Sequence, residues 1–356
     1  MPEPFRGRAR ELRTLVAAFA ARDGTRVALV GSGGSGKSTL AAALGYRLGR
    51  RIPGGREWFR VGRWDHRTLL DMLAIRLGVP LGGFRERARR LSRLRRRLDE
   101  RGRMLVVLDN HENDRATAIL LNALAGPRVC WLITARRCLL SGVSVFPVVA
   151  PLVTAGRSPF PRVAALTSLL RWNPLALDIS DALVATGAVT AGALHDWLAR
   201  RGVARVAAIA HEDDLPEIRL LVRWAWPRVG TTGRRLLTVL AHLEGDHVDA
   251  DALASLARAG RDARPALRRL ARWQLVQQPL PGRWALHATI RHAIEGRTRF
   301  DQRRAVAHFV GLLERHPERL DLEQTHLFAA MDHAHRTSDL TLALRLERLL
   351  ERLGLA

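Results

Sequence analysis

The stretch RVALVGSGGSGKSTLAAALGYRL, residues 26–48, decides the fold of the first part of the chain. Residues 27–30 form a short apolar run of the kind found in buried parallel strands. A glycine-rich turn and an alanine-rich segment suited to a helix follow it. Strand, tight turn and helix in this order begin an α/β crossover unit, which predicts a mainly parallel sheet.

The glycine-rich turn matches the phosphate-loop pattern Gly-x-x-x-x-Gly-Lys-Ser/Thr in full. Glycines let backbone N–H groups approach an anion, and the positive end of the following helix favours negative charge. Lys37 is expected to reach the β- and γ-phosphates, and the Ser38 hydroxyl is expected to bind Mg²⁺. The predicted nucleotide-binding residues of the loop are Gly31, Ser32, Gly33, Gly34, Ser35, Gly36, Lys37, Ser38 and Thr39. The pattern therefore predicts an ATP or ADP site with Mg²⁺.

Lys37 is the only lysine among 356 residues, although Lys and Arg together number 58. Arginine can replace lysine on a solvated face, where only the charge and the aliphatic stem matter. A planar guanidinium is larger and has fixed donor directions, so it should crowd a tight phosphate loop. The retained lysine indicates that the chemistry at position 37 does not accept arginine.

Two further apolar runs end in polar residues. Residues 104–108 lead into Asp109, and residues 129–133 lead into Thr134-Ala135-Arg136. Strand ends in this kind of sheet face the ligand, so Asp109 is expected to hold the Mg²⁺ shell. Arg136 is expected to sense the γ-phosphate, the alternative being an ordinary surface arginine. The predicted catalytic residues are Lys37, Asp109 and Arg136.

Asn110 follows Asp109 at the position where many vigorous ATPases have an acid. Glu112, three residues after Asp109, is a candidate for positioning a water molecule. We expect a slow ATPase that works as a nucleotide switch.

Five elements in one order resemble the NB-ARC branch of the STAND ATPases, a class of signal-transduction switches. They are FRGRARELRTL (5–15), the phosphate loop, LVVLDN (105–110), LITAR (132–136) and RWNPLALDI (171–179). The resemblance covers about residues 5–300. It implies a nucleotide-binding domain, a helical lid and a winged-helix module.

The resemblance also implies roles for single residues. Arg8 and Glu11 would belong to the lid over adenine, and Pro174 would pack near adenine. Asn173 stands where the family has leucine, and Pro174 can equally be the first residue of a helix that Asn173 caps. His287 would contact the β-phosphate of ADP, although it also suits a helix N-terminus.

The family's Met-His-Asp motif, which holds the closed ADP state, corresponds here to residues 286–288. The histidine is present, but Ala288 replaces the aspartate. The resemblance therefore implies a weaker or different inactive-state lock.

We expect four parts: a nucleotide-binding α/β domain (1–152), a helical lid (153–212), a winged-helix domain (213–299) and a short helical tail (300–356). Strands are expected near residues 26–30, 57–61, 104–108, 129–133 and 144–149. The three helices of the tail resemble the start of a tetratricopeptide-like array, with too few repeats for a full one.

The net charge of +24 permits nucleic-acid binding, but a bias that turns lysine into arginine explains it as well. The densest basic run, residues 84–103, has leucines at helical spacing and predicts an amphipathic helix with a solvated basic face. Cys130 and Cys138 lack metal-ligand spacing and suggest reduced thiols in a cytoplasmic protein. No apolar run is long enough to span a membrane, and no signal peptide is recognised.

Three functions remain open at this point. The first is an ATP/ADP switch that forms a homo-oligomer in the ATP state and acts with a separate effector or sensor protein. The second is a DNA-binding ATPase that uses the winged helix, in which residues 264–276 are the candidate recognition helix. The third is a scaffold with a degenerate nucleotide site, against which the intact phosphate loop argues.

Overall fold

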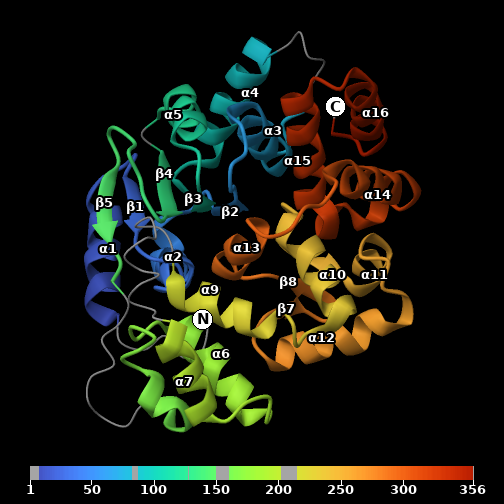
Figure 1. Ribbon diagram of the computed structural model, residues 1–356. Helices are drawn as coiled ribbons and strands as arrows, with labels where there is room; N and C mark the ends of the chain where they lie inside the picture. Colours follow the sequence, from blue (N-terminus) through green and yellow to red (C-terminus); the bar gives the residue numbers. More distant parts are fainter. Residues whose placement is uncertain (1–7, 82–86, 127, 150–159, 202–214, 356) are drawn as a thin grey trace. The chain divides into compact units, whose positions relative to one another are not determined.

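The computed structural model describes residues 8–81, 87–126, 128–149, 160–201 and 215–355 (Figure 1). The chain divides into two compact units. The first comprises residues 1–31, 36–148 and 309–356, and the second comprises residues 32–35 and 149–308. The predicted domain boundaries at 152 and 212 lie outside the described residues, so the four-part division stays a prediction.

The first unit is built on a five-stranded sheet with the order β2-β3-β4-β1-β5. Each pair of neighbouring strands is parallel, which confirms the predicted α/β fold with a mainly parallel sheet. The strands are β1 (Arg26–Val30), β2 (Arg56–Arg60), β3 (Met104–His111), β4 (Val129–Ala135) and β5 (Ser144–Pro147). The strands predicted from apolar runs are therefore present within a few residues.

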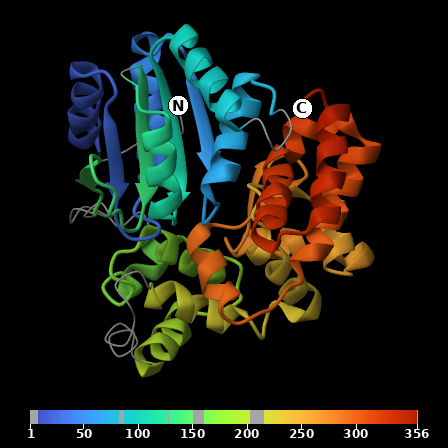
Figure 2. The same cartoon turned by 90° about the horizontal axis from the view of Figure 1, so that it is seen from above.

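Helices cover both faces of this sheet (Figure 2). The helices α1 (Ala9–Ala21) and α2 (Lys37–Leu48) share one core with alternate residues of β1, β3 and β4. Phe19, Leu44 and Leu132 are buried in that core. The helices α3 (His66–Leu77), α4 (Arg87–Arg101) and α5 (Asp114–Ala123) complete the unit with the tail. Burial on both sides explains why β3 and β4 begin as continuous apolar runs.

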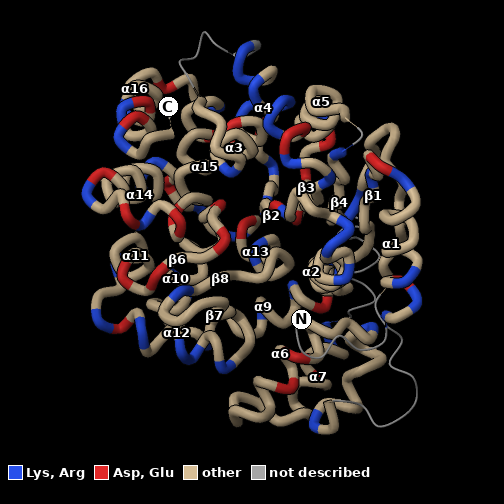
Figure 3. The backbone as a smooth tube through the Cα atoms, turned by 180° about the vertical axis from the view of Figure 1, so that it is seen from behind, with Lys and Arg blue, Asp and Glu red and all other residues tan. Residues whose placement is uncertain are grey.

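Within the basic run, residues 87–101 form α4, which appears as a blue stretch in Figure 3. Leu94 and Leu98 are buried, and arginines occupy all three positions between them. The predicted amphipathic helix is confirmed. Several of its arginines have structural partners: Arg95 donates to the Ala123 carbonyl at 2.8 Å and Arg97 to the Leu77 carbonyl at 3.1 Å.

The predicted three tail helices are α14 (Gln302–Arg315), α15 (Leu320–Thr337) and α16 (Leu340–Arg352). In the first unit α15 packs on α3 (Figure 1). The Asp65 N–H donates to Asp332 Oδ1 at 2.9 Å, and the rings of Trp64 and Phe328 meet edge to face with centroids 6.1 Å apart. The end of the tail is held as well, because the Leu81 N–H donates to the Leu355 carbonyl at 3.0 Å.

The second unit begins with helices in the region of the expected lid. These are a 3-10 segment (Pro161–Leu166), α6 (Pro174–Ala185) and α7 (Ala191–Arg201). The expected winged-helix region contains α9 (Pro216–Ala225), α10 (Gly230–His242), β6 (Val248–Asp249), α11 (Ala250–Leu256), α12 (Ala263–Arg272), β7 (Gln277–Leu280), β8 (Arg283–Ala285) and α13 (Ala288–Glu295). In this region β7 and β8 pair as an antiparallel hairpin, and β6 adds a third strand in the order β6-β8-β7.

Within the described ranges, none of the helices combines the length and the apolar character needed to cross a membrane.

Candidate nucleotide-binding site

The glycine-rich loop has the backbone that its sequence predicts. Gly34 has φ +75° and Gly36 has φ +86°, in the left-handed region that side chains other than glycine rarely adopt. Helix α2 begins directly afterwards at Lys37. The Gly31 N–H donates to the Ala135 carbonyl at 3.3 Å, which ties the start of the loop to the end of β4. The loop thus delivers the positive end of α2 to the carboxyl edge of the sheet.

The side chain of Lys37 folds back onto this loop, and its ammonium donates to the Gly31 carbonyl at 2.8 Å. Burial is the main cause that lowers its pKa from the usual 10.5 to about 8. Arg136 and Arg8 lower the pKa of Lys37 further by charge repulsion, while Asp109 partly opposes them. The electrostatics therefore show that Lys37, Arg136 and Arg8 share one neighbourhood, in which a polyanion would relieve the repulsion.

Arg8 precedes the first residue of α1 and is only 6% exposed. Burial lowers the pKa of Arg8, although the Glu11 carboxylate 3.8 Å away favours its charge. Its guanidinium also approaches the phosphate loop, since a Cβ on Gly36 would lie 3.7 Å from Arg8 Nε. The rest of the predicted Phe5-Arg6-Gly7-Arg8 element lies outside the described residues.

Ser38, Asp109 and Thr134 form an oxygen cluster beside Lys37. The Ser38 hydroxyl donates to Asp109 Oδ1 at 2.7 Å, and the Thr134 hydroxyl donates to the same oxygen at 2.5 Å. One carboxylate with hydroxyl oxygens is a donor set that Mg²⁺ accepts when a nucleotide supplies further oxygens. The residues present therefore fit the ion that the phosphate-loop pattern predicts.

Thr134 was missed as a site residue when the sequence alone was considered. Its position gave a usable signal, because it is the first polar residue after the apolar run of β4. Its hydroxyl also accepts a hydrogen bond from the Asn110 N–H at 3.0 Å. Thr134 thus fixes both Asp109 and the irregular end of β3, where Asn110 has φ +57° and the pairing with β4 shifts register.

Glu112, the candidate for positioning water, is held by two neighbours. Its Oε2 lies 3.0 Å from Arg63 Nε, and its Oε1 accepts from Asn110 Nδ2 at 3.0 Å. Glu112 thereby fixes the turn after β3, and its role in positioning a water molecule stays a prediction.

Asn173 and His287 have structural roles in the second unit. The Asn173 side chain accepts from the Ala176 N–H at 3.1 Å and caps α6, whose first residue is Pro174. His287 Nδ1 accepts from the Thr289 N–H at 3.2 Å and caps α13. The predicted capping at both positions is confirmed. Contacts of Pro174 and His287 with a nucleotide stay predictions.

The pKa of Lys37 predicts how nucleotide affinity depends on pH. Bound phosphates favour the ammonium, so binding should raise this pKa and take up a proton when the free protein is above pH 8. Well below pH 8 Lys37 is already charged, so we expect ADP affinity not to depend on pH through this group. As pH rises from 8 towards 9.5, the affinity should fall, by about tenfold per pH unit at most. Titrations with a fluorescent ADP analogue from pH 7 to 9.5 measure this. A flat profile would contradict the assignment.

Comparison by sequence gives no matching family model and no matching curated protein. Comparison of structures gives distant likenesses, among them the following three. The Aeropyrum pernix Orc1 protein in complex with DNA has 16% identity and a TM-score of 0.35, over 82% of this chain and 92% of that one. Cdc6p from Pyrobaculum aerophilum has 14% identity and a TM-score of 0.37, over 84% and 96%. Drosophila ORC bound to DNA has 15% identity and a TM-score of 0.37, over 82% and 87%. Structural similarity with identities and TM-scores this low does not assign the chain to a family. The NB-ARC resemblance stays a prediction from motifs.

Proposed function

We propose that the chain is a Mg²⁺-dependent, ATP- and ADP-binding P-loop protein with slow ATPase activity. The observation that carries this proposal is that the Lys37 ammonium, held at the phosphate loop, and the Ser38–Asp109 pair lie together at the start of α2, where the Asp109 charge acts on Lys37. Positive charge suits the phosphates there, and the oxygen pair suits the metal.

The residues have separate tasks in this proposal. The loop N–H groups and Lys37 bind and orient the phosphates, and Arg136 contacts the terminal phosphate. Ser38 and Asp109 would hold Mg²⁺, which when bound would neutralise phosphate charge. Thr134 fixes the Asp109 carboxylate through its 2.5 Å hydrogen bond. Because Asn110 stands where many vigorous ATPases have an acid, rapid hydrolysis is not expected.

The use we propose for this site is a conformational switch, in which ATP favours a homo-oligomer that acts on a separate effector or sensor protein. A switch requires different contacts with ATP and ADP. Arg136 is suited to supply that difference, because it adds to the positive charge around Lys37 and a third phosphate would bring further negative charge. The order of NB-ARC-like motifs supports the same use.

The switch predicts a change of mass in solution. With Mg²⁺ and a non-hydrolysable ATP analogue we expect a larger species than with ADP, measured by light scattering after size exclusion. Arg136→Ala should abolish the difference while retaining ADP binding, and Arg137→Ala, one residue along the chain, serves as the control. Identical masses with both nucleotides, with and without candidate partners, would count against the switch.

A second candidate is DNA binding through α12, which the arrangement of its two faces favours. Leu267 and Leu270 are buried, whereas Arg268 and Arg272 are exposed. The predicted recognition helix therefore separates its core stripe from its basic face. Two of its other arginines are engaged within the protein: Arg264 lies 3.0 Å from Asp251, and Arg269 donates to the Val229 carbonyl.

DNA binding predicts a steep dependence on salt. Arg268→Ala combined with Arg272→Ala should weaken binding to duplex DNA and reduce the slope of log affinity against log salt by about two. Fluorescence anisotropy over a range of salt concentrations measures both. Arg348→Ala with Arg352→Ala removes the same charge from α16 and serves as the matched control. Equal losses in both double variants would indicate attraction by net charge alone.

A further inference from the structure

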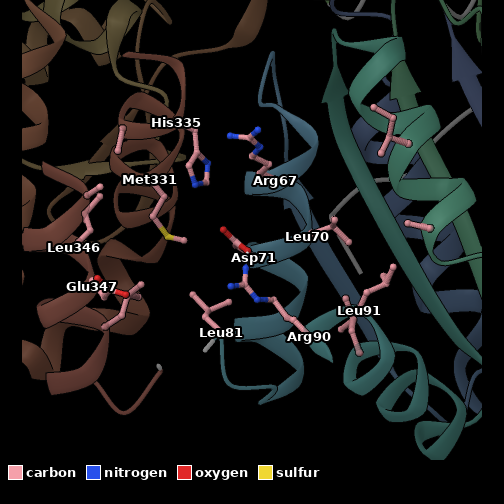
Figure 4. Close-up of a pocket in the computed structure, with 16 residues that line it drawn as sticks. Arg67, Leu70, Asp71, Leu81, Arg90, Leu91, Met331, His335, Leu346 and Glu347 are labelled. Atoms are coloured by element: carbon pink, nitrogen blue, oxygen red, sulfur yellow. Dashed lines mark hydrogen bonds and ion pairs between the residues drawn. The ribbon is translucent and has the colours of Figure 1, made fainter. Parts of the chain in front are cut away.

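A cavity of about 380 Å³ lies within the first unit, between α3 and α4 on one side and α15 and α16 on the other (Figure 4). Leu70, Leu81, Met331, Leu346 and Leu350 are among the apolar side chains that line it. All five are 8% exposed or less, so they form walls of the protein interior rather than a surface patch. The volume lies within the range of sites for small organic molecules.

Polar side chains gather at one end of this cavity. Figure 4 shows Arg67 from α3 and His335 from α15 facing each other there, with Asp71 beside them. His335 Nδ1 lies 3.3 Å from the Thr68 hydroxyl, which orients the ring. An apolar chamber with a few convergent polar groups is the usual form of a ligand site.

The charges at the polar end favour a negatively charged head group. Arg90 forms an ion pair with Asp71, and both side chains are largely buried at 15% and 7% exposed. Burial raises the pKa of Asp71, and Arg90 and His335 oppose that shift. Asp71 is matched by Arg90, and the Arg67 guanidinium and the His335 ring, which also contacts Thr68, line the same end of the cavity. Glu347, the other carboxylate of the lining, lies on the α16 side beside Leu346, as Figure 4 shows.

We propose that this cavity binds a small amphipathic carboxylate, with its hydrocarbon chain among the leucines and Met331 and its head group between Arg67 and His335. This site is separate from the nucleotide site and does not depend on the proposed function. The ligand would contact α3 and α15 at once and would therefore stabilise the packing of the tail on the α/β domain.

Decanoate is a suitable probe, because it has this chemistry and can be used below the concentration at which it forms micelles. Calorimetric titration of the full chain should show one saturable site. Decan-1-ol, which has the same chain without the charge, should bind more weakly, and decylamine should bind more weakly still. Absence of saturable decanoate binding, or equal binding of decylamine, would overturn the proposal.

Leu346→Trp should fill the cavity and weaken decanoate binding by about tenfold or more. Leu344→Trp is the matched control, since Leu344 is on the same helix, is 56% exposed and does not line the cavity. Unchanged binding in Leu346→Trp, or equal losses in both variants, would place the probe elsewhere and contradict the site.

The head-group contact has its own test, which keeps the proposal falsifiable if Leu346→Trp fails to fold. Arg67 is exposed, so Arg67→Gln should leave the fold intact. It should weaken decanoate binding by about threefold to fivefold and leave decan-1-ol unchanged, whereas Arg67→Lys should retain most of the affinity. Equal effects on the acid and the alcohol would show that Arg67 does not meet the carboxylate.

Discussion

Replacing Lys37 with alanine is expected to weaken ATP and ADP binding by about 100-fold, the equivalent of two strong charge-assisted hydrogen bonds. The ammonium lies within the phosphate loop, 2.8 Å from the Gly31 carbonyl, where bound phosphates would replace that carbonyl as its partner. Equilibrium titration with fluorescent nucleotide analogues measures the loss. Thermal unfolding of the free protein controls for folding, and removal of this buried charge should not lower the melting temperature.

Lys37→Arg should lose nearly as much affinity as Lys37→Ala. The structure supports this expectation because Arg136 and Arg8 already place two guanidinium groups close enough to lower the pKa of Lys37. A third, bulkier guanidinium would have to share this space. If Lys37→Arg binds nucleotide normally, the explanation for the single lysine of the chain is wrong.

Replacing Asp109 with asparagine is expected to remove the contribution of Mg²⁺ to ATP binding, a change of about tenfold to 100-fold in affinity. The amide has the shape of the carboxylate, and its oxygen can still accept from Ser38 and Thr134, but it lacks the negative charge that attracts Mg²⁺. The affinity for ADP measured with EDTA should change little. Titration of ATP with and without Mg²⁺ separates the two effects.

Asp99→Asn is the matched control for this variant, because Asp99 is exposed on α4 and its carbonyl accepts from Arg128 at the start of β4, at the opposite end of the strand from Thr134. Thr134→Val tests the support of Asp109 and should reduce the Mg²⁺ effect by less than Asp109→Asn does. If Asp109→Asn keeps the full gain in affinity from Mg²⁺, the metal is not held at this oxygen cluster.

The sequence made the geometry around the phosphate loop predictable because its parts are local or follow from the parallel sheet. The loop of residues 31–38 carries a complete pattern in eight residues, and buried strands leave apolar runs that end at the site. Asp109 is joined to Ser38 at 2.7 Å, and Arg136 influences Lys37, as strand ends at one edge of a sheet require.

Contacts between segments that are far apart in the chain left no such pattern in the sequence. The Asp65 N–H meets Asp332 across 267 positions, and no periodicity in either segment indicates that pairing. The sequence therefore did not indicate that α15 packs on α3 within the first unit, and the resemblance of the tail to a repeat array stays a prediction. β6 is only two residues long, too short for any alternation to show.

Asn173 and His287 both lie in segments that resemble family motifs, and both cap helices. Each precedes a helix and accepts a hydrogen bond from an N–H of its first turn. A residue selected for capping and one selected for nucleotide contact can occupy the same place, so the sequence alone left both interpretations open. The structure establishes the caps, and nucleotide titration of His287→Asn, which keeps a capping side chain, addresses the other role.

Calorimetric titration of the unmodified chain with ATP, in the presence and absence of Mg²⁺, tests the central claim most directly. The Lys37, Ser38 and Asp109 arrangement predicts one ATP per chain and tighter binding with Mg²⁺ than with EDTA. Absence of saturable binding at millimolar ATP, or binding that Mg²⁺ does not strengthen, would contradict it.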